Sequence, residues 1–168
     1  MEKFGVICVG YQGIGKSTLA NKYQKYLDLE SGNFWIGRVR HEDWYVTYAT
    51  IAMHLASQGH VVFVSSHKEV RDYLNSVPLP HNVYLMCCVP SPELKDEWIK
   101  KLHDRFESSN LEKDYKAWKN AEDRYLDNIQ EIRNSFDIVC ELDSMDYELI
   151  IEIQDVLGQH GLHIHLSC

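Results

Sequence analysis

The sequence of 168 residues predicts a single α/β domain with three layers, in which a five-stranded parallel sheet is flanked by helices. Two observations favour this fold. Apolar runs of strand length alternate with helical periodicity along the chain, which is typical of βαβ units. The segment 10–17 also fits G-x-x-x-x-G-K-[ST], and it stands between the first apolar run and the first helical stretch. In such sheets ligands bind at the carboxyl ends of the strands.

The first strand is expected over residues 4–9 and the first helix over 17–26, with a phosphate-binding loop between them. Glycines let this loop curl so that its N–H groups point at a phosphate, and the helix N-terminus adds partial positive charge. The lysine reaches the β- and γ-phosphates, and the hydroxyl holds Mg²⁺. A chance match is the alternative, but the flanking elements argue against it. The predicted cofactors are therefore ATP and Mg²⁺, bound by Gly10, Gln12, Gly13, Ile14, Gly15, Lys16, Ser17 and Thr18, with Ser17 as the metal ligand.

The next elements follow from the hydrophobic pattern. A short second strand is expected over 27–30, then a loop to residue 42, and then a helix over 43–57 closed by Gly59 in a left-handed cap. The buried stripe of that helix should be Tyr48, Ile51, Ala52 and Leu55. Nearly continuous apolar runs at 60–66 and 82–89 indicate strands buried on both faces, with a short helix over 67–75 between them.

The second half of the chain predicts a helical lid over approximately residues 91–134. Ser91 and Pro92 open its first helix, which runs to about residue 107, and a charged helix follows over 111–134. A fifth strand is expected over 135–142 and a last helix over 145–157, ended by Gly158. The tail 160–166 alternates and predicts a small edge strand.

The composition excludes several classes of function. A net charge of −8 argues against broad, sequence-independent binding to nucleic acid, which relies on neutralising phosphates. No stretch of 18 apolar residues predicts a membrane span, and the N-terminus lacks the layout of a signal peptide. The five cysteines are expected to be small buried hydrophobes in a reducing cytoplasm. The sequence leaves a homodimer open.

The phosphate loop alone does not choose between GTPases, motor ATPases and kinases of small molecules. The guanine-reading pattern N/T-K-x-D of GTPases is absent. Motor ATPases place an acid at the end of an apolar strand, whereas the strand 60–66 here ends in Ser65-Ser66-His67. The lack of both patterns favours a kinase of small molecules. Such a kinase can hold Mg²⁺ with the loop hydroxyl and use a different acid for the acceptor.

The chain resembles the nucleoside and nucleotide kinases among P-loop proteins, in the compact form common in bacteriophages and related bacterial genes. The resemblance is carried by the loop 10–17, by Asp28-Leu29-Glu30-Ser31, by segment 59–67 with the helix containing Glu69-Val70-Arg71, and by the helical excursion after Pro90. It implies transfer of the γ-phosphoryl group of ATP to a nucleoside, a nucleotide or a similar small acceptor. It also implies a lid that closes over the phosphates. The resemblance does not choose between ATP and GTP as the donor.

The acceptor side begins at the end of the second strand. Asp28 and Glu30 fall on one side of it by alternation, and in the resembled kinases an acid there orients or deprotonates the attacking hydroxyl. A solvated strand end is the alternative. Arg38 and Arg40, in the following loop, could hold an acceptor phosphate bidentately, although exposed loop arginines usually do nothing specific.

Four further side chains are candidates for the acceptor site. Trp44 and Tyr48 share a helix face and could stack on a base, although aromatic residues at this spacing are more often core. His67 and Arg71 lie one turn apart just beyond a strand end. Arg71 is expected to point into the crevice at the carboxyl ends of the strands. For His67, the alternative is that it does no more than cap the helix that follows it.

The local charge pattern of the lid points to one arginine. Lys100 and Lys101 can pair with Asp96 and Glu97, one turn before them, whereas Arg105 has no acid three or four positions away. A triphosphate would supply the missing anion, so Arg105 is the predicted lid arginine. Arg124 is a weaker second candidate.

Three histidines in the tail, His160, His163 and His165, could bind a metal, but no acid or cysteine joins them at ligand spacing. Loose histidines are commoner than ligands. Two alternatives to a kinase of small molecules stay open: a hydrolase of nucleoside triphosphates and a nucleotide-binding module without catalysis. The net charge of −8 makes a kinase that acts on the 5′ end of a polynucleotide less favoured.

Overall fold

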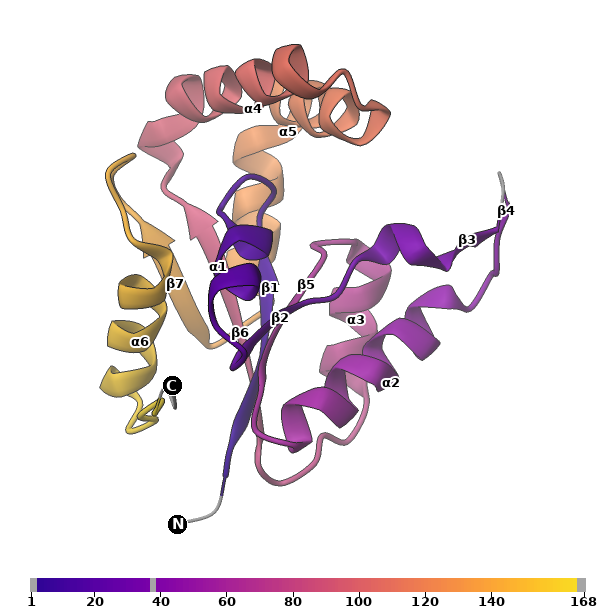
Figure 1. Cartoon of the computed structure of the whole chain (residues 1–168), viewed down its shortest axis with the longest axis vertical. Coiled ribbons are helices and arrows are strands. Elements are labelled where there is room, and N and C mark those ends of the chain that lie inside the picture. The colour runs from indigo at the N-terminus through magenta and orange to yellow at the C-terminus, as the bar shows by residue number, and fades with distance from the viewer. Residues whose placement is uncertain (1–2, 37–38, 166–168) are drawn as a thin grey trace.

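The computed structural model describes residues 3–36 and 39–165, and its centre is a five-stranded parallel sheet (Figure 1). The strand order is β2-β5-β1-β6-β7, so the strand before the phosphate loop is the middle one. This confirms the predicted parallel sheet flanked by helices. The strands are β1 (Gly5–Gly10), β2 (Tyr26–Asp28), β5 (Val61–Val64), β6 (Val83–Pro90) and β7 (Ile138–Leu142).

Helices cover both faces of the sheet. Helices α2 and α3 lie together on one side, and α6 lies on the other side against β7 (Figure 1). Every residue of β1 and β5 is buried, as expected for strands covered on both faces. The helices are α1 (Lys16–Lys22), α2 (Trp44–Ser57), α3 (Lys68–Ser76), α4 (Lys95–Ser109), α5 (Glu112–Asn134) and α6 (Leu149–Gln159).

Two glycines let α2 pack against the sheet and turn into β5. A Cβ on Gly5 would lie 1.6 Å from the carbonyl oxygen of Ala56, so only glycine allows the end of α2 to approach β1 this closely. Gly59 has φ +100° and donates its N–H to the carbonyl of Ala56 at 2.9 Å. The predicted left-handed cap is thereby confirmed. The buried stripe of α2 is Trp44, Tyr48, Ala49, Ala52 and Ala56, and the prediction for Ile51 was wrong because that side chain is exposed.

The predicted loop before α2 contains regular structure. A short 3₁₀ helix, η1 (Ser31–Phe34), leads into an antiparallel pair formed by β3 (Trp35–Ile36) and β4 (Val39–Arg40). The apolar side chains of Ile36 and Val39 are largely exposed on this pair. This arm stands beside the carboxyl edge of the main sheet (Figure 1).

The region predicted to be the lid, residues 91–134, is an antiparallel pair of helices beyond the carboxyl edge of the sheet. The 3₁₀ helix η2 (Pro92–Leu94) leads into α4, and Asn110 turns the chain into α5 with φ 55°. Helix α5 is kinked at Arg124, where φ is −140° and ψ is 22°. In Figure 1, α4 and the first part of α5 lie at the top, above the loop that precedes α1.

The end of the chain departs from the prediction. Helix α6 begins at Leu149 instead of residue 145, and it continues through Gly158 to Gln159. The left-handed residue after it is Gly161, with φ +76°. Residues 160–165 form no strand, so the expected edge strand is absent from them, and Leu166 lies outside the described residues.

Candidate functional site

The phosphate loop adopts the curled backbone that its glycines predict. Gly13 and Gly15 have φ of +88° and +102°, values that L side chains rarely adopt. Gly15 is the N-cap of α1, and its carbonyl accepts the N–H of Leu19 at 3.1 Å. Ser17 and Thr18 are exposed in the first turn of α1. The loop thus leads directly into a helix N-terminus, where partial positive charge favours an anion.

Two carbonyl groups of the loop are held away from its centre by partners from distant elements. The indole Nε1 of Trp98, on α4, donates to the carbonyl of Gln12 at 2.9 Å. The hydroxyl of Tyr147, just before α6, donates to the carbonyl of Ile14 at 2.8 Å. With these acceptors engaged outside the turn, the N–H groups remain to face a phosphate. The geometry therefore fits the triphosphate of a nucleotide.

The two clamp residues, Trp98 and Tyr147, also contact each other. Their rings stack with centroids 6.0 Å apart, and the ammonium group of Lys101 lies over both and donates to the Tyr147 hydroxyl at 3.0 Å. A Cβ on Gly13 would meet the Trp98 nitrogen at 3.3 Å and Leu102 at 2.9 Å. Sequence reasoning did not identify either clamp residue. It also paired Lys101 with Glu97, whereas the described partner is Tyr147.

Lys16 and Asp28 come together at the carboxyl edge of the sheet. The Lys16 ammonium donates to the carbonyl of Gly10 at 3.3 Å. Burial lowers the pKa of Lys16, and the nearby Asp28 carboxylate is the main opposing influence. Burial likewise raises the pKa of Asp28, opposed chiefly by Lys16. Glu30 acts on both groups through charge. The predicted grouping of a phosphate-loop lysine and strand-end acids is therefore present in the structure, while their roles stay proposals.

Arg105 has a partner that the helical spacing did not reveal. Its Nε lies 3.1 Å from Oδ1 of Asp114, which is buried on α5, and the Ser109 hydroxyl donates to the other oxygen of that carboxylate. The expectation of an unpaired arginine was wrong, because the acid comes from the neighbouring helix. Arg105 is still half exposed, and its charge acts on both Lys16 and Asp28. It therefore lies near the phosphate loop.

A cavity of about 820 Å³ opens between the arm and α5, next to the phosphate loop. Glu30, Trp35 and Arg40 line one wall, and Lys113, Lys116 and Asn120 of α5 line the other. Gln12 crosses from the loop to α5, where its amide donates to the carbonyl of Ala117 at 3.0 Å. The cavity thus combines both signs of charge with an aromatic face, within reach of the loop.

Arg40 is held in place by aromatic rings. Its guanidinium lies 3.9 Å from the ring centre of Trp44 and 4.5 Å from that of Trp35, and one nitrogen donates to the carbonyl of Ser31 at 2.9 Å. The Nε of Arg40 is buried and has no hydrogen-bond partner among the described residues. Arg38, its predicted companion, lies outside the described residues.

Trp44 and Tyr48 do not form the open stacking wall that the prediction allowed. Both are buried, and the Tyr48 hydroxyl donates to the carbonyl of Leu29 at 2.6 Å while it accepts the N–H of Ser65 at 2.8 Å. Tyr48 therefore joins the ends of β2 and β5. Trp44 contributes to the cavity only indirectly, because its ring packs against the guanidinium of Arg40.

His67 lines the cavity, whereas Arg71 does not point into the crevice. The His67 ring pairs with the Ser65 hydroxyl at 2.7 Å and packs edge-on against Trp44, and its side chain makes no cap bond to α3. Arg71 is buried and bonds to Ser66 and to residues of α5, including an ion pair with Glu131 at 3.6 Å. Arg71 is a structural link between α3 and α5, so its expected orientation was wrong.

Arg124, the second lid candidate, is half exposed and pairs with Glu131 at 3.1 Å.

The cysteines Cys8, Cys87, Cys88 and Cys140 are buried and free, as predicted, and Cys168 lies outside the described residues. In the described part of the chain, no three side chains of histidine, cysteine, aspartate or glutamate form a group that could hold a metal ion. Among the helices of residues 3–36 and 39–165, none has the length and apolarity needed to cross a membrane.

The fold is shared with solved structures of low sequence identity. A gluconokinase from Sinorhizobium meliloti 1021 matches with a TM-score of 0.52 and 14% identity, over 95% of this chain and 94% of that one. A tunicamycin resistance protein from Deinococcus radiodurans matches with a TM-score of 0.54 and 12% identity, over 99% of both chains. No protein-family model and no curated protein sequence matches the chain.

The parallel sheet, the phosphate loop and these likenesses together define a P-loop kinase-like fold. At such identities the likeness concerns the fold alone. What the protein acts on is therefore inferred from its own site.

Proposed function

We propose that this protein is a kinase that transfers the γ-phosphoryl group of ATP to the hydroxyl or phosphate group of a small acceptor. The observation that carries the proposal is the curled phosphate loop, in which left-handed Gly13 and Gly15 lead into α1 at Lys16, beside Asp28 at the end of β2. A lysine there counters the charge of the transferring group, and a carboxylate beside it can orient the attacking oxygen.

The phosphates of ATP would be held by the N–H groups of residues 13–18 and by Lys16, and Mg²⁺ by the Ser17 hydroxyl. Bound magnesium supplies neutralisation of charge that develops on the phosphates. The clamp residues Trp98 and Tyr147 keep the loop curled before the nucleotide arrives, which avoids reorganisation during the reaction. Arg105 and Lys113 add positive charge on the lid side, as their effect on Asp28 indicates.

Asp28 is the proposed group that accepts the proton of an attacking hydroxyl, with Glu30 beside it on the cavity wall. Because burial raises its pKa, Asp28 is a stronger base than an exposed aspartate, which favours proton abstraction. The charge of Lys16 acts in the opposite direction and favours the carboxylate form.

The acceptor would occupy the 820 Å³ cavity between the arm and α5. Its size is that of sites for small ligands, and Trp35 offers a half-exposed ring on which a base could stack. Arg40, with an unpartnered buried Nε and a fixed guanidinium, suits an acceptor phosphate. These features support a nucleoside or nucleoside monophosphate as the acceptor class.

The proposal is tested by incubating the protein with γ-labelled ATP and Mg²⁺ and a panel of nucleosides, nucleoside monophosphates, gluconate and a 5′-hydroxyl oligonucleotide. Label should move to one small acceptor, and Lys16→Ala should abolish the transfer. Lys68→Ala, a surface lysine paired with Asp72 on its own helix, is the matched control and should behave as the parent. Release of free phosphate at a useful rate without any acceptor would identify a hydrolase instead. Binding of ATP without transfer or release would indicate a nucleotide-binding module.

A further inference from the structure

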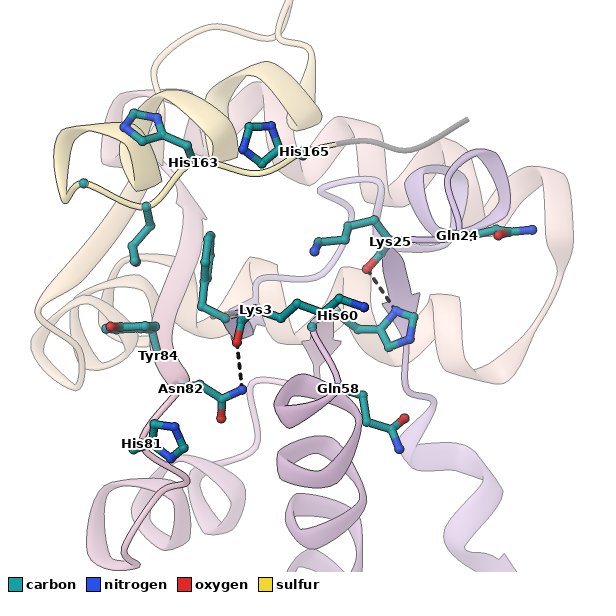
Figure 2. A pocket seen from close by; sticks show the side chains of 14 residues that line it. Lys3, Gln24, Lys25, Gln58, His60, His81, Asn82, Tyr84, His163 and His165 are labelled. Carbon is teal, nitrogen blue, oxygen red and sulfur yellow. Dashed lines mark hydrogen bonds between the residues drawn. The ribbon is translucent and has the colours of Figure 1, made fainter. Parts of the chain in front are cut away.

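A second cavity, of about 960 Å³, lies at the amino edge of the sheet, away from the phosphate loop (Figure 2). Its walls are the residues just before four strands: Lys3 and Phe4 before β1, Lys25 before β2, His60 before β5, and the segment 81–82 before β6. The amino ends of parallel strands meet at one edge, so residues far apart in the sequence gather there. Strand β1 separates this cavity from the loop by about 17 Å, at 3.3 Å per residue.

The cavity is lined by cationic and titratable nitrogen groups in a chain whose net charge is −8. None of the described residues that line it carries a carboxylate. Two lysine ammonium groups within a concave surface focus positive potential and attract anions, and imidazole nitrogens beside them can form hydrogen bonds. The lining nitrogen groups are those of Lys3, Lys25, His60, His81, His163 and His165.

The two lysines are brought together by the backbone. Gly59 has no side chain, and a Cβ at its position would lie 3.8 Å from the Lys25 ammonium and 3.6 Å from the Lys3 chain. Burial lowers the pKa of Lys25, and the charge of Lys3 lowers it further. Two cations therefore approach each other across a glycine, and an anion between them would relieve the repulsion.

The floor of the cavity is fixed by hydrogen bonds that do not use the cations. The amide of Asn82 donates to the main-chain oxygens of Lys3 and Ser57, both at 2.9 Å, and the His60 ring contacts the carbonyl of Lys25 at 3.4 Å (Figure 2). These bonds engage backbone oxygens, and no hydrogen bond or ion pair of the Lys3 or Lys25 ammonium group is found within residues 3–36 and 39–165.

One side of the cavity offers an aromatic surface. Phe4 and Tyr84 pack edge to face with ring centres 6.1 Å apart, and 39% of Tyr84 is exposed. In Figure 2, Tyr84 and His81 stand on one side of the cavity, while His163 and His165 extend over it from the segment after α6. An anion that also carries a flat ring would contact both kinds of surface.

We propose that this cavity is a second anion site, which binds the phosphate groups of a small polyphosphate or nucleoside phosphate independently of the phosphate loop. Lys3 and Lys25 hold the anion, the histidine rings offer N–H groups that can donate hydrogen bonds to it, and Tyr84 contacts a base where one is present. Free polyphosphate and nucleotide share this chemistry, and only the nucleotide uses the tyrosine.

The test is titration calorimetry on the full chain carrying Lys16→Ala, so that the phosphate loop contributes little. Pyrophosphate and ADP are the two probes. Adding Lys3→Gln and Lys25→Gln should weaken binding of both probes by about tenfold or more, since two charge-assisted contacts are lost. The matched control adds Lys68→Gln and Lys100→Gln instead, which removes the same charge from helix surfaces and should change the dissociation constant by less than about twofold.

A second pair of substitutions, His163→Gln and His165→Gln, tests the site without disturbing the fold, because both residues lie on an exposed segment outside any helix or strand. They should also weaken pyrophosphate binding, with an unchanged melting temperature. Tighter binding of ADP than of pyrophosphate, lost in Tyr84→Ala, would identify a nucleotide site, and equal binding a polyphosphate site. The proposal is overturned if neither probe binds, or if the lysine pair and its control weaken binding equally. Its failure would leave the proposed kinase activity untouched, since that activity depends on Lys16.

Discussion

At the scale of single residues, the proposed chemistry depends on a lysine and an aspartate that share a partly buried environment. Burial disfavours the charged form of each, and each charge partly restores the other. The protonation of each group therefore depends on the charge of the other. Groups whose pKa is shifted by burial and by a specific charged partner are candidates for sites that move protons.

Turnover should depend on pH through Asp28. Because burial raises the pKa of Asp28, the side chain becomes protonated at a higher pH than an exposed aspartate would. The carboxylate is the active form, so kcat should be full above this pKa and should fall as the pH is lowered through it. Asp28→Asn should lower kcat by about 100-fold or more, and the remaining rate should lack this acidic limb.

The measurement is the pH profile of kcat for the parent and for Asp28→Asn with the acceptor found in the screen. Glu112→Gln serves as the control, since Glu112 lines the same cavity but is largely exposed and pairs with Lys116 on its own helix. An Asp28→Asn variant with parental turnover and the same acidic limb would remove the aspartate from the mechanism.

The sequence predicted the curled phosphate loop and the place of Asp28 at a strand end, but it mispredicted the partners of several other candidate residues. The loop residues and Asp28 follow from a local motif and a strand end, both of which are local properties. The partner of Arg105, by contrast, is Asp114 on another helix, and Arg71 turns toward Glu131, 60 positions away. Helical spacing compares residues three and four apart, so it cannot register an ion pair made between helices.

At the scale of elements, the lid hairpin is attached to the loop that it covers. Trp98 of α4 donates a hydrogen bond to the carbonyl of Gln12 in the loop. The side-chain amide of Gln12 in turn donates to the carbonyl of Ala117 on α5. Tyr147, before α6, stacks against Trp98 and donates to the carbonyl of Ile14 in the same loop. A movement of α4 would therefore displace the loop carbonyl groups that are bonded to it.

Trp98→Phe should impair ATP binding while leaving the fold intact. A phenylalanine ring keeps part of the packing of the indole, but the loss of the indole N–H releases the carbonyl of Gln12, so the curled loop is less preorganised. We expect the KM for ATP to rise about three- to tenfold, on the scale of one hydrogen bond of about 1 kcal/mol, with kcat less affected.

Steady-state kinetics at saturating acceptor give this KM. Trp118→Phe is the matched control, because Trp118 lies in the lid helices against Phe106 and His103 and has no contact with the loop among the described interactions. Equal KM values in the two variants would show that the indole bond does not hold the loop for ATP.

Element prediction succeeded where local pattern and burial agree. The strands β1, β5 and β6 are continuous apolar runs, and Gly59 ends α2 as its position predicts. The arm formed by β3 and β4 was expected to be loop, because two-residue strands with exposed apolar side chains carry no alternation to detect. Helix α6 passes through Gly158, where packing of Leu157 in the core outweighs the helix-breaking tendency of glycine.

At the scale of the whole molecule, the sheet separates two different surfaces. Its carboxyl edge carries the phosphate loop, Asp28 and the cavity of about 820 Å³, and its amino edge carries the lysine and histidine cavity. The alternation of strands and helices predicted the first of these, since ligands of such sheets bind at the carboxyl edge. The second could not be predicted, because it gathers residues from before four strands and from the tail.

In the proposed function, the N–H groups of residues 13–18 and the ammonium of Lys16 surround the phosphates of ATP. This arrangement can be measured by titrating the ¹⁵N-labelled protein with Mg·ATP and following the backbone amide chemical shifts. We expect large, saturable shifts at Gly13, Gly15, Lys16 and Ser17, which Lys16→Ala should reduce strongly. Unchanged amide signals in this loop at saturating ATP, or identical shifts in the parent and in Lys16→Ala, would contradict it.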